Sequence, residues 1–211
     1  MTSSLLVFLH GLGGTPQAWQ AQVAALPPGM KAAAPWVEGC RPGALAPFDL
    51  GRAADAALTQ LNRFGVDSMA LCGVSLGAVV ATEAAIRSPR AVSHLILAGG
   101  QVRASRLAIT AQSLALRAMP AAAFASSGLG KPALLQTLRA IGRVDFRASL
   151  SRITAQTLVL CGEADRANLP AAQQLAAGIP GARLEVIPGA GPGLFQEAPE
   201  VVNRLLYDFL A

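Results

Sequence analysis

Histidine and cysteine are both scarce in this chain, and their scarcity excludes several kinds of site. Two histidines, His10 and His94, occur in 211 residues. They are far apart and lack paired carboxylates, so we expect no metal site. The three cysteines, Cys40, Cys72 and Cys161, are an odd number without a Cys-x-x-Cys pair, which disfavours a disulfide framework. Cys72 and Cys161 each end an apolar run, where cysteine behaves as a small hydrophobic residue.

Long hydrophobic runs are also missing. No apolar run approaches the roughly 18 residues that a membrane-spanning helix needs. Leu5–Leu9 is too short for the apolar part of a signal peptide, and no basic segment precedes it. Because 53% of the residues are hydrophobic and 14% are charged, the composition is that of a globular protein. We therefore expect one cytoplasmic domain over residues 1–211, with no membrane partner, and nothing indicates an oligomeric state.

The chain carries a formal net charge of +5, and the basic residues are unevenly distributed. Residues 101–152 hold eight basic side chains and one acid, Asp145. Such a segment is either a solvated surface or a basic cover over a pocket for an anionic small-molecule substrate. Nucleic-acid binding is not expected, because no basic run is interleaved with aromatic residues. The eight are Arg103, Arg106, Arg117, Lys131, Arg139, Arg143, Arg147 and Arg152.

Short apolar runs alternate with segments of helical period, which predicts an α/β fold. About six parallel strands covered by helices on both faces are expected. The predicted strands are Leu5–Leu9, Lys31–Pro35, Met69–Cys72, His94–Ala98, Thr157–Cys161 and Arg183–Ile187. The predicted helices are Pro16–Leu26, Arg52–Phe64, Ser75–Arg87, Pro170–Ala177 and Pro199–Leu210. Binding sites in such sheets lie beyond the carboxyl ends of the strands.

Residues 101–152 form a longer connection between two predicted strands. Ser105–Met119 and Lys131–Ile141 have helical patterns separated by Pro120, so a small helical cap is expected. An apolar pocket is expected beneath it, although core packing is an alternative for each wall residue. The candidate wall residues are Leu107, Leu114, Leu116, Met119 and Phe124 of the insert, with Trp19, Trp36 and Phe195.

The segment Gly73–Gly77 has the pattern Gly-x-Ser-x-Gly and stands between a predicted strand and a predicted helix. This is the setting of a nucleophile elbow, in which glycines permit a tight turn that exposes the serine. Ser75 is therefore the candidate nucleophile. The glycine-rich turn His10–Gly14 after the first strand can direct a backbone amide at the same place, and the amide of Leu76 would be the second donor of an oxyanion hole. The turn departs from the dinucleotide-binding fingerprint, so no cofactor is expected.

Together these features resemble the α/β-hydrolase superfamily, from Leu5 to Leu210. The matching segments are His10-Gly11 after the first strand, the elbow, Leu158–Asp165, and Ile187–Gly191 before the last helix. The resemblance implies Ser75 as nucleophile, Asp165 as triad acid, and the amides of Leu12 and Leu76 as oxyanion donors. It is strongest for compact esterase, lactonase and thioesterase-like members. The alternative for Asp165 is a surface turn residue paired with Arg166.

The chain departs from this superfamily at Pro192, where its members carry the histidine base. Proline has neither an imidazole nor a backbone N–H, so it can neither accept the serine proton nor bond to the acid. His94 is expected at the opposite edge of the sheet. His10 is expected at the correct edge, where the resemblance implies that it supports the loop; a role as surrogate base is the alternative. The triad is therefore incomplete.

Three functions follow from an elbow without its base. The first is a serine-hydrolase-type enzyme for a small carbonyl or ester substrate, with hydrolysis impaired by Pro192. The second is a non-hydrolytic enzyme, such as a lyase or cyclase, that uses the oxyanion hole alone. The third is a protein that binds its ligand without catalysis. Loss of the base costs on the order of 10⁶-fold in turnover, so efficient ester hydrolysis is not expected.

Overall fold

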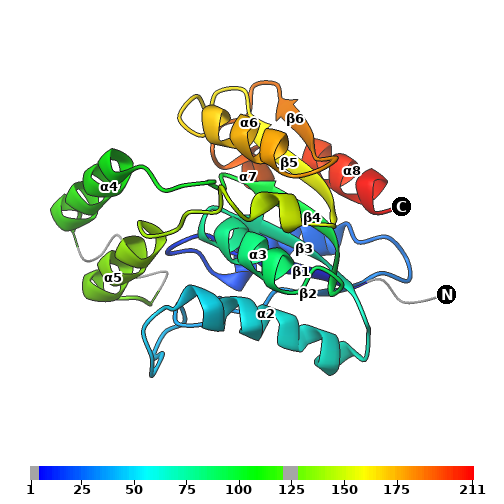
Figure 1. Cartoon of the computed structure of the whole chain (residues 1–211), viewed down its shortest axis with the longest axis horizontal. Coiled ribbons are helices and arrows are strands. Elements are labelled where there is room, and N and C mark those ends of the chain that lie inside the picture. Colours follow the sequence, from blue (N-terminus) through cyan, green and yellow to red (C-terminus); the bar gives the residue numbers. More distant parts are fainter. Residues whose placement is uncertain (1–4, 121–127) are drawn as a thin grey trace.

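A computed structural model of the chain describes residues 5–120 and 128–211. Its centre is a six-stranded sheet in which every neighbouring pair is parallel, in the order β2-β1-β3-β4-β5-β6 (Figure 1). The strands are β1 Leu5–Leu9, β2 Lys31–Ala33, β3 Met69–Val74, β4 Val92–Ala98, β5 Gln156–Gly162 and β6 Arg183–Ile187. The predicted fold class, with its six-stranded parallel sheet, is confirmed.

Helices cover both faces of the sheet. The two faces follow from the alternation of side chains along each strand. In β1, Leu5, Val7 and Leu9 belong to a core cluster with side chains of α2, α3 and α6, while Leu6 and Phe8 belong to a second cluster with side chains of the segment η1, α7 and α8. The helices are η1 Pro16–Trp19, α1 Gln20–Ala24, α2 Leu50–Phe64, α3 Leu76–Arg87, α4 Arg106–Ala118, α5 Lys131–Ile141, η3 Leu150–Arg152, α6 Leu169–Gly178, α7 Leu194–Glu197 and α8 Pro199–Leu210.

Several element boundaries differ from the sequence prediction for local reasons. The helix α2 begins at Leu50 because the Asp49 carboxylate accepts a hydrogen bond from the Arg52 amide, at 2.9 Å. The predicted helix over Pro16–Leu26 is divided into the 3-10 segment η1 and the short α1. The strand β3 continues through Gly73 and Val74 directly into the elbow. The short helix α7 was not predicted.

The insert 101–152 leaves the sheet after β4 and returns to it before β5. Its two ends pair with each other: the Phe146 amide donates to Val102 O at 2.8 Å, and Arg103 and Asp145 form an isolated antiparallel bridge. Between these ends lie α4 and α5, which extend past the carboxyl ends of the strands (Figure 1). That the insert works as a cap stays a prediction.

Most of the predicted pocket walls are wrong. Trp19 and Phe195 belong to the core, where their rings meet edge to face with centroids 4.7 Å apart. Leu107 and Leu114 are exposed to solvent, and Leu116 packs against the core cluster instead. Met119 is 42% exposed, and Trp36 lies edge-on to the His10 ring. Phe124 lies outside the described residues.

The strand order reverses between β1 and β3. The chain passes from β1 to β2 on one side and returns to β3 on the other. At such a point the connections leave in opposite directions, so a crevice opens at the carboxyl ends of the two strands. The segment from His10 follows β1 and Ser75 follows β3. The topology therefore places the two predicted halves of the site at this position.

Candidate active site

Ser75 occupies a strained turn between β3 and α3. Its φ of 52° makes it the single non-glycine residue with positive φ in the part of the chain that the structure describes. The side chain is exposed, whereas Leu76 next to it is buried. The Ser75 amide is fixed by a 2.8 Å hydrogen bond to Ala98 O of β4. Strain of this kind, held by surrounding structure, supports a functional position for Ser75.

The flanking glycines are required by close backbone contacts. A Cβ at Gly73 would overlap the carbonyl group of Gly77, and a Cβ at Gly77 would overlap the Leu9 oxygen at the end of β1. Both positions therefore exclude every other residue unless the backbone shifts. The glycines bring the first turn of α3 against the end of β1. This is the physical reason for the Gly-x-Ser-x-Gly spacing.

The two candidate oxyanion donors, the amides of Leu12 and Leu76, belong to segments that lie next to the serine. A Cβ built on Gly11 would lie 3.5 Å from Ser75 Cβ, so the loop after β1 is in contact with the elbow. Leu76 is the first residue of α3, and the amide of a first helical residue has no partner within its helix. The Leu12 amide likewise has no backbone partner among the described residues. The positive end of the α3 dipole adds to the attraction for an anion here.

His10 is held by hydrogen bonds at both ring nitrogens. Its Nδ1–H donates to Gly11 O at 2.9 Å, and its Nε2 accepts from the Val37 amide at 3.1 Å. The residue is 1% exposed, and burial lowers its pKa. An imidazole bonded in this way has no free nitrogen for the serine proton. His10 therefore supports the loop, and the alternative of a surrogate base loses its geometric ground.

His94 lies in the first half of β4, where its register partners are Ala70 and Gln156. Its Nδ1 is 3.1 Å from Ser93 Oγ, and its ring meets Phe209 of α8 edge to face. A hollow of about 510 Å³ at the amino ends of β1, β3 and β4 is partly lined by this residue. His94 is thus at the edge of the sheet opposite to Ser75, as the sequence predicts.

Asp165 follows β5 and is 7% exposed. Its Oδ2 accepts a 2.8 Å hydrogen bond from Asn168 Nδ2, and its backbone N–H donates to Gly162 O. Within residues 5–120 and 128–211 it forms no ion pair, so the alternative of a surface pair with Arg166 is not supported. Sequence reasoning missed Asn168; the Asp-x-x-Asn spacing before α6 was the available signal.

Pro192 is exposed in a loop that two carboxylates hold. Glu197 of α7 accepts hydrogen bonds from the amides on either side of Pro192, those of Gly191 and Gly193. Glu163 accepts from the Gly189 amide at 3.0 Å. These hydrogen bonds therefore fix the backbone on both sides of residue 192, although the proline ring itself offers no polar atom. Neither carboxylate was predicted to hold this loop.

The site residues share one edge of the sheet at different separations. Gly11 and Ser75 are in contact, whereas Asp165 follows the strand two places beyond β3 and Pro192 the strand three places beyond it. Two strand spacings correspond to about 10 Å. The turn after β5, which carries Asp165, also contacts the Pro192 loop. The Ala164 amide donates a hydrogen bond to Ala190 O at 2.9 Å, and a Cβ on Gly162 would overlap the same carbonyl group.

Comparison with known proteins identifies the family of the chain. A model of the "Alpha/beta hydrolase family" matches residues 6–205. The chain belongs to the alpha/beta hydrolase family. A curated relative, the "Putative carbamate hydrolase RutD" of Serratia proteamaculans, is 26% identical over 97% of this chain and 90% of its own length. A pimeloyl-[acyl-carrier protein] methyl ester esterase of Aromatoleum aromaticum is 37% identical over 44% of this chain and 36% of its own length.

Solved structures of this fold superpose over nearly the whole chain. The enol-lactonase from Burkholderia xenovorans LB400 has a TM-score of 0.86 and 18% identity, with 100% of this chain and 92% of that chain covered. A hydrolase from Pseudomonas aeruginosa has a TM-score of 0.80 and 24% identity, covering 99% and 90%. These likenesses establish the α/β-hydrolase fold. Separately, no helix in the described part of the chain is long and apolar enough to span a membrane.

Proposed function

We propose that this α/β-hydrolase is a serine-hydrolase-type enzyme for a small carbonyl or ester substrate, with hydrolysis impaired by Pro192. The observation that carries the proposal is the strained, exposed Ser75 beside Gly11 and at the first turn of α3. The names of the relatives, a carbamate hydrolase, an esterase and an enol-lactonase, support carbonyl chemistry of this class.

In the proposed reaction, Ser75 Oγ attacks the substrate carbonyl, a solvent water takes the Ser75 proton, and the amides of Leu12 and Leu76 stabilise the resulting oxyanion. The oxyanion then collapses, the bond to the leaving alcohol breaks, and that alcohol takes a proton from solvent. A second water hydrolyses the Ser75 ester and releases the acid. Asp165, held by Asn168, is the carboxylate that would orient a base. Pro192 stands where the family carries that base, and it cannot receive the serine proton. What remains without a base is about 10³–10⁴-fold over water, from the oxyanion donors and substrate binding.

A second candidate is a non-hydrolytic enzyme that uses the oxyanion hole alone. Pro192 and the bonded ring of His10 favour it, because together they leave Ser75 without an imidazole partner. Enolisation, cyclisation or elimination of a reactive substrate needs a stabilised oxyanion and no activated serine. A protein that binds a ligand without catalysis would need the same pocket. Neither alternative needs Ser75 as a nucleophile, and that difference can be measured.

The first experiment asks whether Ser75 reacts covalently. The protein is incubated with a fluorophosphonate probe and its intact mass is measured. A stoichiometric adduct that disappears in Ser75→Ala supports an exposed nucleophile. Absence of any adduct in the unaltered chain and in Pro192→His would contradict the assignment of Ser75.

The second experiment restores the base. Short p-nitrophenyl esters are assayed with the unaltered chain, with Pro192→His and with Pro192→His/Ser75→Ala. We expect Pro192→His to raise turnover by at least about 10²-fold, since general-base catalysis contributes 10²–10⁴-fold, and the double variant to lose that gain. A folded Pro192→His protein without a gain in esterase activity would overturn the impaired-hydrolase proposal.

A further inference from the structure

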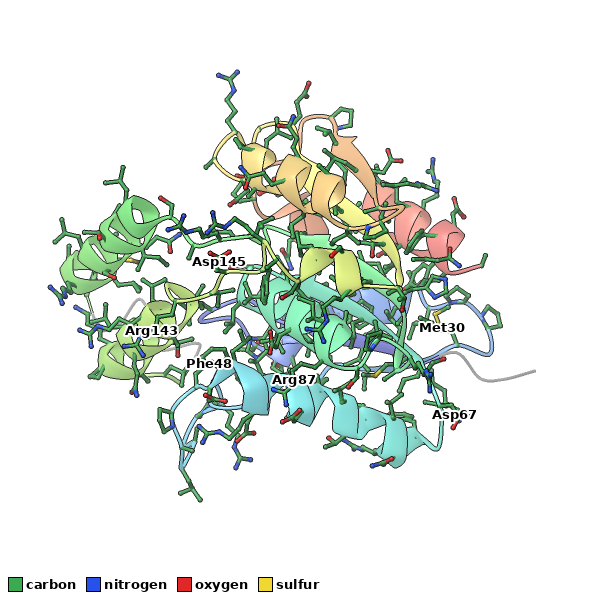
Figure 2. All side chains as sticks on the ribbon, viewed as in Figure 1. Met30, Phe48, Asp67, Arg87, Arg143 and Asp145 are labelled. Carbon is green, nitrogen blue, oxygen red and sulfur yellow. The ribbon has the colours of Figure 1, made fainter. Side chains whose placement is uncertain are left out.

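A second hollow, of about 760 Å³, lies between α5 and the start of α2, away from Ser75. Its floor is apolar and includes Phe48, which is 6% exposed, together with Leu50 and Leu135. Arg139 and Arg143 line its rim. Figure 2 labels Phe48 near the start of α2 and Arg143 at α5, and both residues line the hollow. A volume of this size is within the range of small-molecule sites.

The two arginines are exposed and have no acid partner in the part of the chain that the structure describes. The one acid of the insert, Asp145, is already shared by Arg147 at 2.6 Å and Arg103 at 3.9 Å. Asp49 also lines the hollow, but its Oδ1 caps α2 by accepting from the Arg52 amide. The rim therefore carries more positive than negative charge.

We infer that this hollow binds a small amphipathic anion, with its carboxylate or phosphate head on Arg139 and Arg143 and its hydrocarbon part on the floor formed by Phe48, Leu50 and Leu135. Guanidinium groups match both oxyanions by paired N–H donors. The apolar floor provides a surface for a short alkyl chain. The inference does not depend on whether Ser75 is a nucleophile.

A ligand bound in the hollow would affect the loop after β1, next to the elbow, through α5. The opposite flank of α5 carries Leu134, which is buried and would be 3.9 Å from a Cβ on Gly13 in the loop after β1. Thr137 on the same flank lies 4.0 Å from Cys40 Sγ. A ligand that fixes α5 would therefore also fix the segment that carries Leu12. We expect an effector of the site rather than a substrate.

The test is isothermal titration with three probes of equal chain length: octanoate, octyl phosphate and octanol. We expect saturable binding of at least one anionic probe and none of octanol, and the better anion identifies the head group. Arg139→Gln/Arg143→Gln should weaken binding about tenfold or more. Arg117→Gln/Arg152→Gln, which removes two charges of the same insert outside the hollow, should leave it unchanged.

The alternative is that the two arginines only stabilise the C-terminal end of α5. In that case Arg139→Gln/Arg143→Gln lowers the Tm of the protein, but the unaltered chain binds neither octanoate nor octyl phosphate. That result would overturn the inference. It is also overturned if octanoate binds and Arg139→Gln/Arg143→Gln does not weaken it, because the ligand then sits elsewhere, for example at Ser75. Should that variant not fold, Leu135→Ser replaces it, with the same expected loss of affinity.

Discussion

His10 lies at the edge of the candidate active site, and both of its ring nitrogens are hydrogen-bonded. Its Nδ1–H is committed to Gly11 O, and its Nε2 to the Val37 amide. Protonation would turn Nε2 from an acceptor into a donor facing another donor. The neutral ring is therefore part of the folded structure, and the loop after β1 depends on it.

The pH dependence of stability follows from this arrangement. Because burial lowers the pKa of His10, the unfolded chain binds the proton more readily than the folded one. The stability contributed by neutral His10 is complete above about pH 6.5, the pKa of an exposed histidine, and decreases as the pH falls below it. Burial lowers the pKa of His94 in the same direction.

We expect Tm to fall between pH 7.5 and pH 5, as measured by circular dichroism. His10→Asn should have a lower Tm at pH 7.5 and a weaker change of Tm with pH. His94→Asn measures how much of the change of Tm with pH comes from the other histidine. If Tm of His10→Asn depends on pH as steeply as Tm of the unaltered chain, the buried His10 ring is not the cause of the pH dependence.

Gly77 gives a second prediction at this scale. Gly77→Ala would place Cβ on the Leu9 oxygen, so we expect a loss of about 3 kcal/mol or more in the free energy of unfolding. Urea denaturation measures it. In the control Gly130→Ala the new Cβ has its nearest neighbour at 3.6 Å, and a change within about 1 kcal/mol is expected. Equal losses in both variants would contradict the steric explanation.

Single residues differed in how well the sequence predicted them. Ser75 and its glycines were predictable because the motif encodes a backbone conformation, and the structure has that conformation. The pairing of Asn168 with Asp165 depends on the shape of one turn, which residue types alone do not specify. The roles assigned to Asp165 and Pro192 stay predictions that the activity experiments test.

At the scale of elements, the Pro192 loop is held by three hydrogen bonds from backbone amides to carboxylates. Glu197 reaches back from α7 to two amides, and Glu163 reaches across from the end of β5 to a third. The proline between Gly191 and Gly193 therefore stands at a backbone position that is held independently of its own side chain. The backbone of a histidine placed at this position would already be held by these hydrogen bonds.

Glu197→Gln tests this clamp. A glutamine has one acceptor oxygen, so it cannot hold both amides as the carboxylate does. We expect a loss of about 1–2 kcal/mol in the free energy of unfolding, measured by urea denaturation, because charge-assisted hydrogen bonds are lost. In a Pro192→His background, we also expect turnover of p-nitrophenyl esters to fall about tenfold.

The control for the clamp is Glu200→Gln on α8, an exposed carboxylate with no hydrogen bond or ion pair to the described residues. It should leave the turnover unchanged and lower the free energy of unfolding by less than about 1 kcal/mol, the contribution of an acid in the first turn of a helix. A clamp variant as stable as this control would show that Glu197 does not hold the loop.

The sequence predicted helices and strands correctly where a strong hydrophobic pattern lies between clear breaks. The bounds of β1, β6, α5 and α8 match the sequence prediction, since each has a strong pattern between clear breaks. The four-residue α7 was missed because a single turn has too few residues to show a period. Glu197 of this helix nevertheless holds the loop around Pro192, so the missed element borders the candidate site.

At the scale of the whole molecule, α4 is attached differently from the other helices. None of its described side chains is buried, and Leu107 and Leu114 are 81% and 66% exposed. In contrast, ten of the twelve residues of α3 are buried. The fold class with its parallel sheet was predictable because apolar strands alternate with amphipathic helices, whereas the order of the strands was not predicted. The partners of α4 were not, because an exposed apolar stripe reads as a buried face in the sequence.

Hydrogen exchange measured by mass spectrometry should separate these helices. We expect peptides from Arg106–Ala118 to exchange at least about tenfold faster than peptides from Leu76–Arg87, because α4 can open without disturbing the core. Peptides from Lys131–Ile141 should be intermediate, since α5 buries Leu134 and Leu138. Equal protection in α4 and α3 would mean that the outer helix is covered in solution.

The burial of all three thiols makes the chain a convenient scaffold for chemical labelling. Cys40, Cys72 and Cys161 are free and buried, and burial raises their pKa, that of Cys40 to about 11. Alkylating reagents attack thiolates, so these positions should stay silent at neutral pH. A cysteine introduced at exposed Pro192 would then be the single reactive handle. An imidazole-bearing reagent attached there would test whether a proton acceptor at this position activates Ser75.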